Sequence, residues 1–347
     1  MKHGRAVLAT ITVVLGVFVS VGVTRGRSEN KKMNLPDPLK TLDGKKVTSA
    51  EVWRKTRRPE ILELFRKHVY GRAPVGRPEN LKFEVEEVVK DALGGIATKK
   101  RVRISFEGTG GKGALRLYIY VPNKAKKPAP GFLLICHRTS DKIDPDQKVK
   151  NPFWPAEAIV ARGYTAAIYF AQDVDPDKYD KFKNGVHGIF DKIPRKPDAW
   201  ATIAAWAWGA SRAMDYFETD ADIDAKRMAV IGHSRGGKTS LWCGAEDQRF
   251  AMVISNNSRC SGAALAKRKS GERVAWINKG FPHWFCDNYS KFDGKEEEMP
   301  VDQHMLVALA APRPVYVASA SKDSWADPLG EFLACVNAEG VYKLFGL

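Results

Sequence analysis

The sequence predicts an α/β fold in which a mostly parallel sheet is covered by helices on both faces. Three observations support this prediction. Apolar runs of strand length recur along the chain, helical patterns separate the later runs, and a Gly-x-Ser-x-Gly turn lies between one such strand and one such helix. Strands that alternate with helices pair in parallel, because each helix carries the chain back across the sheet.

The strands are predicted from period-two and continuous apolar patterns. In chain order they cover residues 82–89, 100–106, 115–121, 131–136, 164–169, 227–231, 251–254 and 314–318. The first three are expected to form antiparallel hairpins that extend one edge of the sheet. Helical patterns cover residues 155–162, 200–217, 237–245 and 301–310. Because the chain has no internal repeat, one domain is the simplest organisation.

The amino-terminal residues have a layout of their own. Lys2 and Arg5 precede an uncharged apolar run over residues 6–23, and a polar segment follows. This is the layout of a secretory signal, and the run also approaches the shortest length of a membrane anchor. We therefore expect residues 1–24 to be a signal peptide or N-terminal anchor, 25–43 a polar lead segment, and 44–347 the domain of an exported protein, periplasmic or secreted.

The chain of 347 residues carries a formal net charge of +16, spread over basic runs that are mixed with acids. These runs lack the interleaved aromatic residues of a nucleic-acid platform, so we expect no nucleic-acid partner. The charge fits a solvated basic surface or long-range attraction to an acidic polymer, such as a uronic-acid polysaccharide. We expect no membrane partner beyond the anchor named above, and a monomer.

Cysteine and histidine spacing predicts no zinc site, and no Gly-rich phosphate loop follows a strand, so we expect no metal and no cofactor. Five cysteines stand at positions 136, 243, 260, 286 and 335, and their odd number leaves at least one thiol unpaired in an oxidising compartment. Cys260 and Cys286 flank the expected substrate region and are candidates for a disulfide.

The motif Gly232-His233-Ser234-Arg235-Gly236 fits Gly-x-Ser-x-Gly. It lies between the apolar strand RMAVIG and the helical GGKTSLWCGA, which is the context of a nucleophile elbow in an α/β-hydrolase fold. The glycines permit a turn tight enough to project the serine from the sheet, and the following helix directs its N-terminus at a developing oxyanion. Ser234 is therefore the predicted nucleophile.

The catalytic acid of this fold follows a later strand. Asp323 lies in the loop after the buried strand 314–318, which is the expected position, and Asp327 is a nearby competitor. We favour Asp323, because Asp327 precedes Pro328 and has the position of a helix cap.

The segments GHSRGGK, GERVAWINKGFPHWFCDNYSKF and PVDQHMLVALAAPRPVYVASASKDSWADPLGEFLA together resemble the bacterial glucuronoyl esterases of carbohydrate esterase family 15. The resemblance implies a metal-free serine esterase that cleaves the ester between the glucuronic acid of xylan and lignin alcohols. It also implies Ser234 as nucleophile, Arg235 as an oxyanion donor, and Lys238, Glu272 and Trp325 as contacts to the glucuronoxylan or lignin–carbohydrate ester. Basic residues close to the nucleophile suit a uronate ester, whose carbonyl oxygen gains negative charge in the transition state.

Two departures from the family pattern concern the acid and the base. Many members have a glutamate where this chain has Asn257, so the acid is expected at Asp323. After Ser234 the histidines are His283 and His304, and both precede the acid-bearing strand, whereas the histidine of this fold follows the last strand. We therefore expect the catalytic histidine, the last strand and the last helix to be absent from a C-terminally incomplete chain, and only a residual rate to remain.

His137 and His233 are the other histidines near the expected site. We expect His137 to shape the oxyanion or substrate loop and His233 to point away from Ser234, so neither is the predicted base. A sheet without its last strand would have an unpaired edge and an uncovered apolar face, which predicts marginal stability or aggregation.

Alternative functions keep the fold. The ester could be different, as in an acetyl xylan esterase or a prolyl-oligopeptidase-like hydrolase, or the chain could be a catalytically silent glucuronoxylan-binding protein. Hydrolysis of an acetylated sugar and not of methyl glucuronate would exclude the uronate ester, and binding of glucuronoxylan without hydrolysis would support the last alternative.

Overall fold

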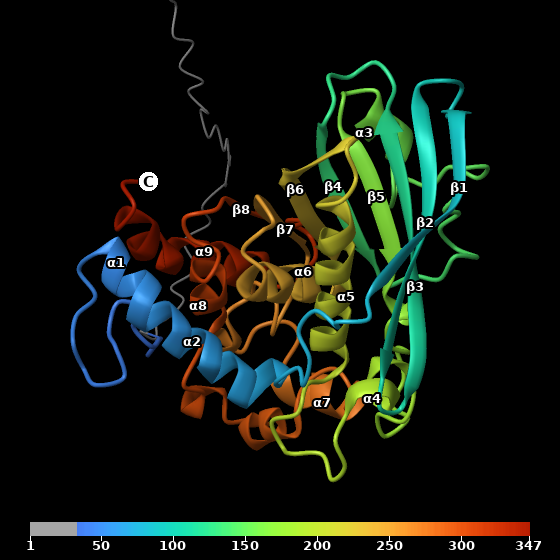
Figure 1. Cartoon of the computed structure of the whole chain (residues 1–347). Helices are drawn as coiled ribbons and strands as arrows, with labels where there is room; N and C mark the ends of the chain where they lie inside the picture. Colours follow the sequence, from blue (N-terminus) through green and yellow to red (C-terminus); the bar gives the residue numbers. More distant parts are fainter. Residues whose placement is uncertain (1–32) are drawn as a thin grey trace, which may run out of the picture. The chain divides into compact units, whose positions relative to one another are not determined.

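The computed structural model describes residues 33–347, and Figure 1 shows the sheet with the helices around it. The predicted signal or anchor at residues 1–24 and residues 25–32 of the polar lead segment lie outside the described residues.

All the predicted strands are present, and they form one eight-stranded sheet in the order β1-β2-β3-β5-β4-β6-β7-β8. The strands are β1 (Lys82–Ala92), β2 (Ala97–Gly108), β3 (Gly111–Pro122), β4 (Ala129–Cys136), β5 (Thr165–Phe170), β6 (Ile223–His233), β7 (Met252–Asn256) and β8 (Val315–Ala318). The strands β1, β2, β3 and β5 pair antiparallel, whereas β5, β4, β6, β7 and β8 pair parallel. The predicted parallel sheet with an antiparallel edge is confirmed.

The predicted helices correspond to α3 (Ala156–Val160), α5 (Thr202–Phe217), α6 (Arg235–Glu246) and α8 (Gln303–Ala308). The chain also forms α1 (Ala50–Val52), α2 (Arg58–Phe65), α4 (Gly185–Phe190), α7 (Val274–Gly280) and α9 (Pro328–Lys343). Within residues 33–347, no helix is long and apolar enough to cross a lipid bilayer.

Helices cover both faces of the sheet, and β5 shows how. Ile168 and Phe170 cluster with Val160 of α3. The intervening Tyr169 points the other way, where its Oη donates a hydrogen bond to the backbone oxygen of Trp206 in α5. Side chains of a strand alternate between its two faces, so β5 has a buried layer on each side. Both faces of this strand therefore contribute to the core.

The residues before α1 are not a free lead segment. The Arg57 guanidinium donates to the backbone oxygens of Asp37 and Pro38, at 3.1 and 3.3 Å. The Nε2 atom of His304, in α8, lies 2.8 Å from the backbone oxygen of Pro36. The compact unit begins at Asn34, ahead of the predicted domain boundary at residue 44. The composition of the segment is polar, but its backbone carbonyls are acceptors for buried side chains.

The candidate Cys260–Cys286 disulfide is absent, because all five cysteines are free thiols. The Cys260 Sγ atom lies 3.8 Å from Ser261 Oγ, whereas Cys286 Sγ lies 3.8 Å from the backbone oxygen of Lys67. The two thiols thus face different neighbours.

The β8 side of the sheet exposes several apolar side chains. Within the described residues β8 is the last strand of the sheet, and Tyr316 on it is 57% exposed. The neighbouring α9 exposes Leu329, Phe332 and Val336. An apolar cleft of about 240 Å³ opens beside β4, lined by Phe132, Leu134, Phe153, Trp154, Pro155, Ile159, Ala167 and Ile231. Within the described residues, exposed apolar side chains thus lie at the β8 edge and on α9, and a separate apolar cleft lies beside β4.

Candidate active site

Ser234 occupies a strained turn between β6 and α6. Its backbone angles are φ 54° and ψ −122°, a combination that residues other than glycine rarely adopt. A Cβ atom on Gly232 would lie 2.0 Å from the backbone oxygen of Gly236, so the turn closes only with glycine there. The Ser234 amide donates to the backbone oxygen of Asn256 at 2.9 Å, which ties the turn to the end of β7. This geometry is that of a nucleophile elbow.

Arg235, the first residue of α6, is held from several sides. Its Nη1 atom donates to the carboxylate of Asp177, which lies in the loop after β5. The guanidinium carbon lies 4.6 Å from the ring centre of Trp284 and 5.0 Å from that of Phe281. Cation–π contacts and a charge-assisted hydrogen bond together fix the plane of the guanidinium.

Asp177 contacts Arg235, Trp284 and His283, and these residues form a clamp around the Arg235 guanidinium. Its Oδ1 atom also accepts from Trp284 Nε1 at 2.9 Å and lies 3.0 Å from His283 Nε2. Burial raises the pKa of the Asp177 carboxyl, but the His283 hydrogen bond, the Arg235 charge and the Trp284 hydrogen bond lower it more, to about 2. The Nε atom of Arg235 is buried and has no partner within residues 33–347, so one donor beside Ser234 is free.

Lys238 lies one turn into α6, where its amide donates to the backbone oxygen of Ser234 at 3.0 Å. Its side chain is only 1% exposed, and the ammonium donates to the backbone oxygens of Ser258 and Cys260 and to Glu272 Oε2, the last at 2.6 Å. An ammonium has three protons, so all are engaged. The carboxylate of Glu272 keeps its Oε1 atom free of hydrogen bonds to residues 33–347, and that atom is the polar group of the pair left for a ligand.

Asp323 lies in the loop after β8, as predicted. Its Oδ2 atom accepts from Asn257 Nδ2 at 3.0 Å and lies 3.8 Å from the Arg259 guanidinium. Asn257 directly follows β7, and its Oδ1 atom accepts from the amide of Ala320 at 2.9 Å, so it links the two loops. The amide therefore orients the carboxylate and does not replace it.

Asp327 has the N-cap position of α9, as expected, but its side chain makes no capping hydrogen bond. Both of its carboxylate oxygens accept from Arg268 Nε, at 3.0 and 2.9 Å. Asp327 is thus a structural partner of Arg268.

Trp325 is 43% exposed and is not a core residue. Its ring stacks on Trp276 of α7, with centroids 5.0 Å apart and planes 6° apart. Trp276 is itself 52% exposed. The Trp325 backbone oxygen accepts from the Glu272 amide at 3.0 Å, which connects the indole pair to Lys238 and the elbow.

Within residues 33–347, no histidine is hydrogen-bonded to Ser234 Oγ. His233 Nδ1 lies 2.6 Å from Asn256 Oδ1, and His304 is buried against Pro36. Burial and the nearby charge of Arg235 lower the pKa of His137 to about 3, so its imidazole is neutral at ordinary pH.

Three site residues were not found from the sequence. Asp177 stands among several acids in QDVDPDKYD, so its composition does not distinguish it, although the position after a parallel strand is a usable signal. Trp276 lies on α7, which is too short for its apolar residues to show a clear helical periodicity. Glu331, in α9, is fully buried and accepts from the Arg259 amide at 2.9 Å and from the Ser258 and Ser319 hydroxyls.

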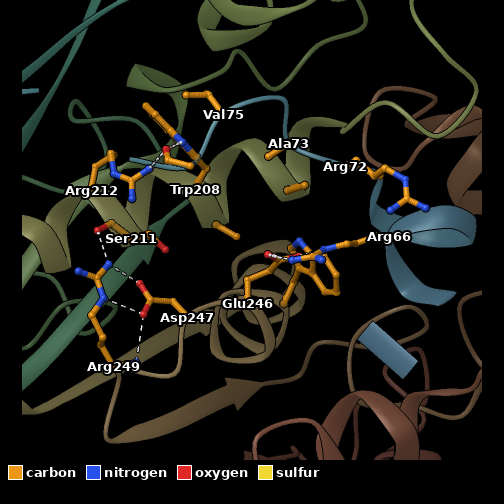
Figure 2. Close-up of a pocket in the computed structure, with 15 residues that line it drawn as sticks. Arg66, Arg72, Ala73, Val75, Trp208, Ser211, Arg212, Glu246, Asp247 and Arg249 are labelled. Atoms are coloured by element: carbon orange, nitrogen blue, oxygen red, sulfur yellow. Dashed lines mark hydrogen bonds and ion pairs between the residues drawn. The ribbon is translucent and has the colours of Figure 1, made fainter. Parts of the chain in front are cut away.

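A separate cavity of about 490 Å³ lies at the other end of α6, and Figure 2 shows the arginines around it. Arg66 forms a bidentate pair with Glu246, and Arg249 pairs with Asp247. Each of these charges is neutralised by a neighbour. No serine elbow lines this cavity, and both Arg66 and Arg249 are already paired with acids. The site around Ser234 is therefore the candidate active site.

Comparison with known proteins gives one consistent result. A family model described as glucuronyl esterase of fungi matches residues 148–346. The carbohydrate esterase MZ0003, from an unknown prokaryotic organism, is 44% identical over 94% of this chain and 82% of its own length. A 4-O-methyl-glucuronoyl methylesterase of Schizophyllum commune is 27% identical over 90% of this chain and 74% of its own.

Solved structures agree. The glucuronoyl esterase of Solibacter usitatus superposes with a TM-score of 0.83 at 42% identity, over 90% of this chain and 86% of that one. A promiscuous family 15 esterase from a marine bacterial metagenome superposes with a TM-score of 0.80 at 45% identity, over 91% and 86% of the two chains.

Proposed function

The chain belongs to the glucuronoyl esterase family, carbohydrate esterase family 15, a family of carboxylic ester hydrolases, and we propose on this basis that it acts on esters of (4-O-methyl)glucuronic acid. The alcohol side of the ester would be a lignin alcohol, and the uronic acid would be a branch of xylan. The relatives whose names contain this activity support the proposal.

The observation that carries the proposal is the clamped Arg235 beside Ser234. Ser234 Oγ attacks the ester carbonyl carbon, the alcohol leaves with a proton, and water then hydrolyses the acyl-serine. The carbonyl oxygen gains negative charge during attack, and the N-terminus of α6 together with the free Arg235 Nε–H stabilises it. A donor held in place before the reaction needs no reorganisation when that charge develops.

The uronate ring then lies against Trp325, with Glu272 Oε1 as acceptor for a ring hydroxyl. Asp323 is the acid of the site, oriented by Asn257. Lys238 acts through Glu272, since its protons are engaged by the protein.

The test is hydrolysis of benzyl glucuronate by the purified chain, with an acetylated xylose as comparison substrate and the Ser234→Ala variant as blank. We expect release of benzyl alcohol that disappears in Ser234→Ala. Hydrolysis of the acetyl ester alone would exclude the uronate proposal in favour of an acetyl xylan esterase.

A second candidate is a glucuronoxylan-binding protein without turnover, favoured by the fact that no histidine within residues 33–347 is hydrogen-bonded to Ser234 Oγ. Imidazole added to the assay separates the two, because a free base can accept the serine proton. A rate that rises with imidazole in the parent and not in Ser234→Ala would identify a working nucleophile without an aligned base. Binding of glucuronoxylan with no hydrolysis in either condition would establish the binder.

We also propose, from the layout of residues 1–24 alone, that the protein is exported, and that it acts as a monomer. Export of a reporter fused to these residues would test the first point, and the molar mass of the purified chain in solution the second.

A further inference from the structure

A cavity of about 650 Å³ lies on the antiparallel part of the sheet, over β1, β2 and β3, which Figure 1 shows at one end of the sheet. On β2, Phe106 packs against Trp208 of α5, with ring centres 5.0 Å apart. Side chains alternate between the two faces of a strand, so Arg103 and Ser105 point away from α5, and both line the cavity. The cavity is therefore on the face of these strands that lies opposite to α5.

The register of the strands explains the shape of the cavity. Ser105 lies opposite Ala114 of β3 on one side and opposite Lys82 of β1 on the other. In the neighbouring row of the same face, Arg103 lies opposite Arg116. Serine and alanine side chains are short, whereas those of lysine and arginine are long. The cavity thus has a floor of small side chains and a rim of cations.

Two of these cations form no ion pair. Lys82 and Arg103 have no carboxylate at ion-pair distance among residues 33–347, although Glu84 lies opposite Arg103 on β1. Glu86 offsets the charge of Arg116, at 3.0 Å from its Nε atom. Like charges on facing positions of an antiparallel pair cost stability, so an anion bound beside Arg103 would relieve that cost. The cations of these strands that do form ion pairs are Lys99, Lys100, Arg101, Lys112 and Arg116.

Two acids also line the cavity, and neither offsets the charges of Lys82 and Arg103. Glu107 pairs with Lys112, at 3.4 Å. The Asp173 Oδ2 atom accepts from the Arg116 amide at 3.4 Å, and burial raises the pKa of the Asp173 carboxyl, so this acid holds its proton to a higher pH than an exposed aspartate does. The lining therefore has an excess of positive charge.

The polar groups that remain free at Lys82, Arg103 and Ser105 are hydrogen-bond donors. Arg103 donates only from Nε, to Ser105 Oγ at 3.3 Å, so its Nη protons are free. The Ser105 hydroxyl accepts this bond and keeps its own proton to donate, and the Lys82 ammonium protons are free as well. A cluster of donors with two unpaired positive charges suits a doubly charged anion with several acceptor oxygens. A carboxylate has a single charge and matches the cluster less well.

We propose that this cavity is a second ligand site, which binds a phosphate dianion through Arg103, Lys82 and Ser105. The planar fork of an arginine matches two phosphate oxygens, and a lysine supplies a compact charge beside it. The dianion is either inorganic phosphate or the phosphate group of a soluble ester. The site is independent of the function proposed for Ser234, which lies between β6 and α6.

The experiment is calorimetric titration of the full chain with inorganic phosphate and with glycerol phosphate, at about pH 8, where a phosphate ester carries close to two charges. We expect saturable binding by the parent, and the same binding by Ser234→Ala. Arg103→Gln and Lys82→Gln should each weaken it by about 10-fold, because each removes a charge-assisted contact. Tighter binding of glycerol phosphate identifies an ester as the ligand, and tighter binding of inorganic phosphate identifies the free ion.

Arg227→Gln is the matched control, because it removes one cation whose side chain is 62% exposed and pairs with Asp224. At an ionic strength of about 0.15 M, charges more than about 8 Å away are largely screened, so this variant should bind within about 2-fold of the parent. Equal weakening by Arg227→Gln, equal affinity for acetate, or no saturable binding by the parent would overturn the proposal. Lys82 is exposed, so Lys82→Gln tests the site even where thermal unfolding shows that Arg103→Gln is misfolded.

Discussion

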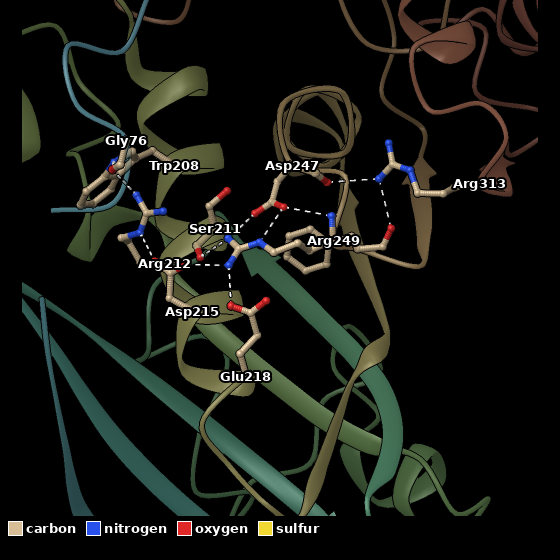
Figure 3. Close-up of polar contacts among 10 residues, drawn as sticks. Gly76, Trp208, Ser211, Arg212, Asp215, Glu218, Asp247, Arg249 and Arg313 are labelled. Carbon is tan, nitrogen blue, oxygen red and sulfur yellow. Dashed lines mark hydrogen bonds and ion pairs between the residues drawn. The ribbon is translucent and has the colours of Figure 1, made fainter. Parts of the chain in front are cut away.

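The two ends of α6 are built differently. At its N-terminus, Ser234, Asn257, Arg259 and Ser261 have positive φ angles. Buried nitrogens without a partner in residues 33–347 gather around the same site, on His137, Arg235, Arg259 and His283. At its C-terminus, shown in Figure 3, Arg249 bonds to Asp247, Asp215 and Glu218, and Arg313 bonds to the backbone oxygens of Gly244, Asp247 and Phe250.

The C-terminal end of α6 therefore contributes mainly to stability, whereas its N-terminal end is arranged for function. Paired charges and filled acceptors at the C-terminal end hold α5, α6 and the loop before β7 together. Strained backbone and free donors at the N-terminal end have no structural benefit of their own, because an unpartnered buried group costs about 1–3 kcal/mol. Such costs are tolerated where a ligand or a transition state supplies the missing partner. Lys238 is the exception, since it is fully paired within the functional end.

The largest effect is expected from Lys238→Met, which leaves Glu272 and two carbonyls buried without their cation. The free energy of unfolding should fall by about 3–5 kcal/mol, as for a broken buried ion pair. Chemical denaturation measures it, and the exposed Lys279→Met is the control, expected within about 0.5 kcal/mol. A loss below about 1 kcal/mol for Lys238→Met would contradict the buried pairing.

A smaller loss, about 2 kcal/mol, is expected from Arg249→Met, because this arginine is partly exposed and the buried Asp215 keeps its second partner, Arg212. The affinity for methyl glucuronate should stay the same, since the change is at the far end of α6. Arg227→Met, which breaks an exposed pair with Asp224, serves as the comparison. A changed ligand affinity in Arg249→Met would show that the two ends are coupled.

Ser234→Gly should raise the free energy of unfolding by about 1 kcal/mol, because glycine adopts the Ser234 backbone angles without strain. Ser211→Gly, in the middle of α5 and beside the cavity of Figure 2, should lower it by a similar amount. Thermal unfolding of the two variants side by side measures the contrast. Equal signs for the two changes would remove the claim that strain is concentrated at the elbow.

The smallest effect concerns Glu331, which ties together the loops that carry Asn257 and Asp323. Burial raises the pKa of its carboxyl, so the stability that it contributes is present in acid and is lost as the pH rises through the folded-state pKa. Glu331→Gln keeps the acceptor for the Arg259 amide and should stabilise the chain at neutral pH, by less than about 1 kcal/mol. The gain should vanish at about pH 4 in melting curves. A gain that is equal at both values would exclude ionisation as the cause.

The sequence by itself determined the strands, the four helices that alternate with the later strands, the elbow at Ser234 and the loop position of Asp323. These are local signals, since apolar periodicity and a glycine-bounded turn are written in consecutive residues. Local sequence was a poor guide to contacts between distant segments. Residues 34–43 are polar but are held by Arg57 and His304. Cys260 and Cys286, the candidate disulfide pair, face different neighbours.

Only the tertiary structure decided which side chains meet. Asp177 accepts a hydrogen bond from Arg235, which is 58 positions further along the chain. Lys238 is buried against Glu272, and Trp276 stacks on Trp325. Parallel strands bring their carboxyl ends to one edge of the sheet, so residues far apart in sequence become neighbours there. The contacts of the site depend on that crossing of loops, which no pattern within a single segment encodes.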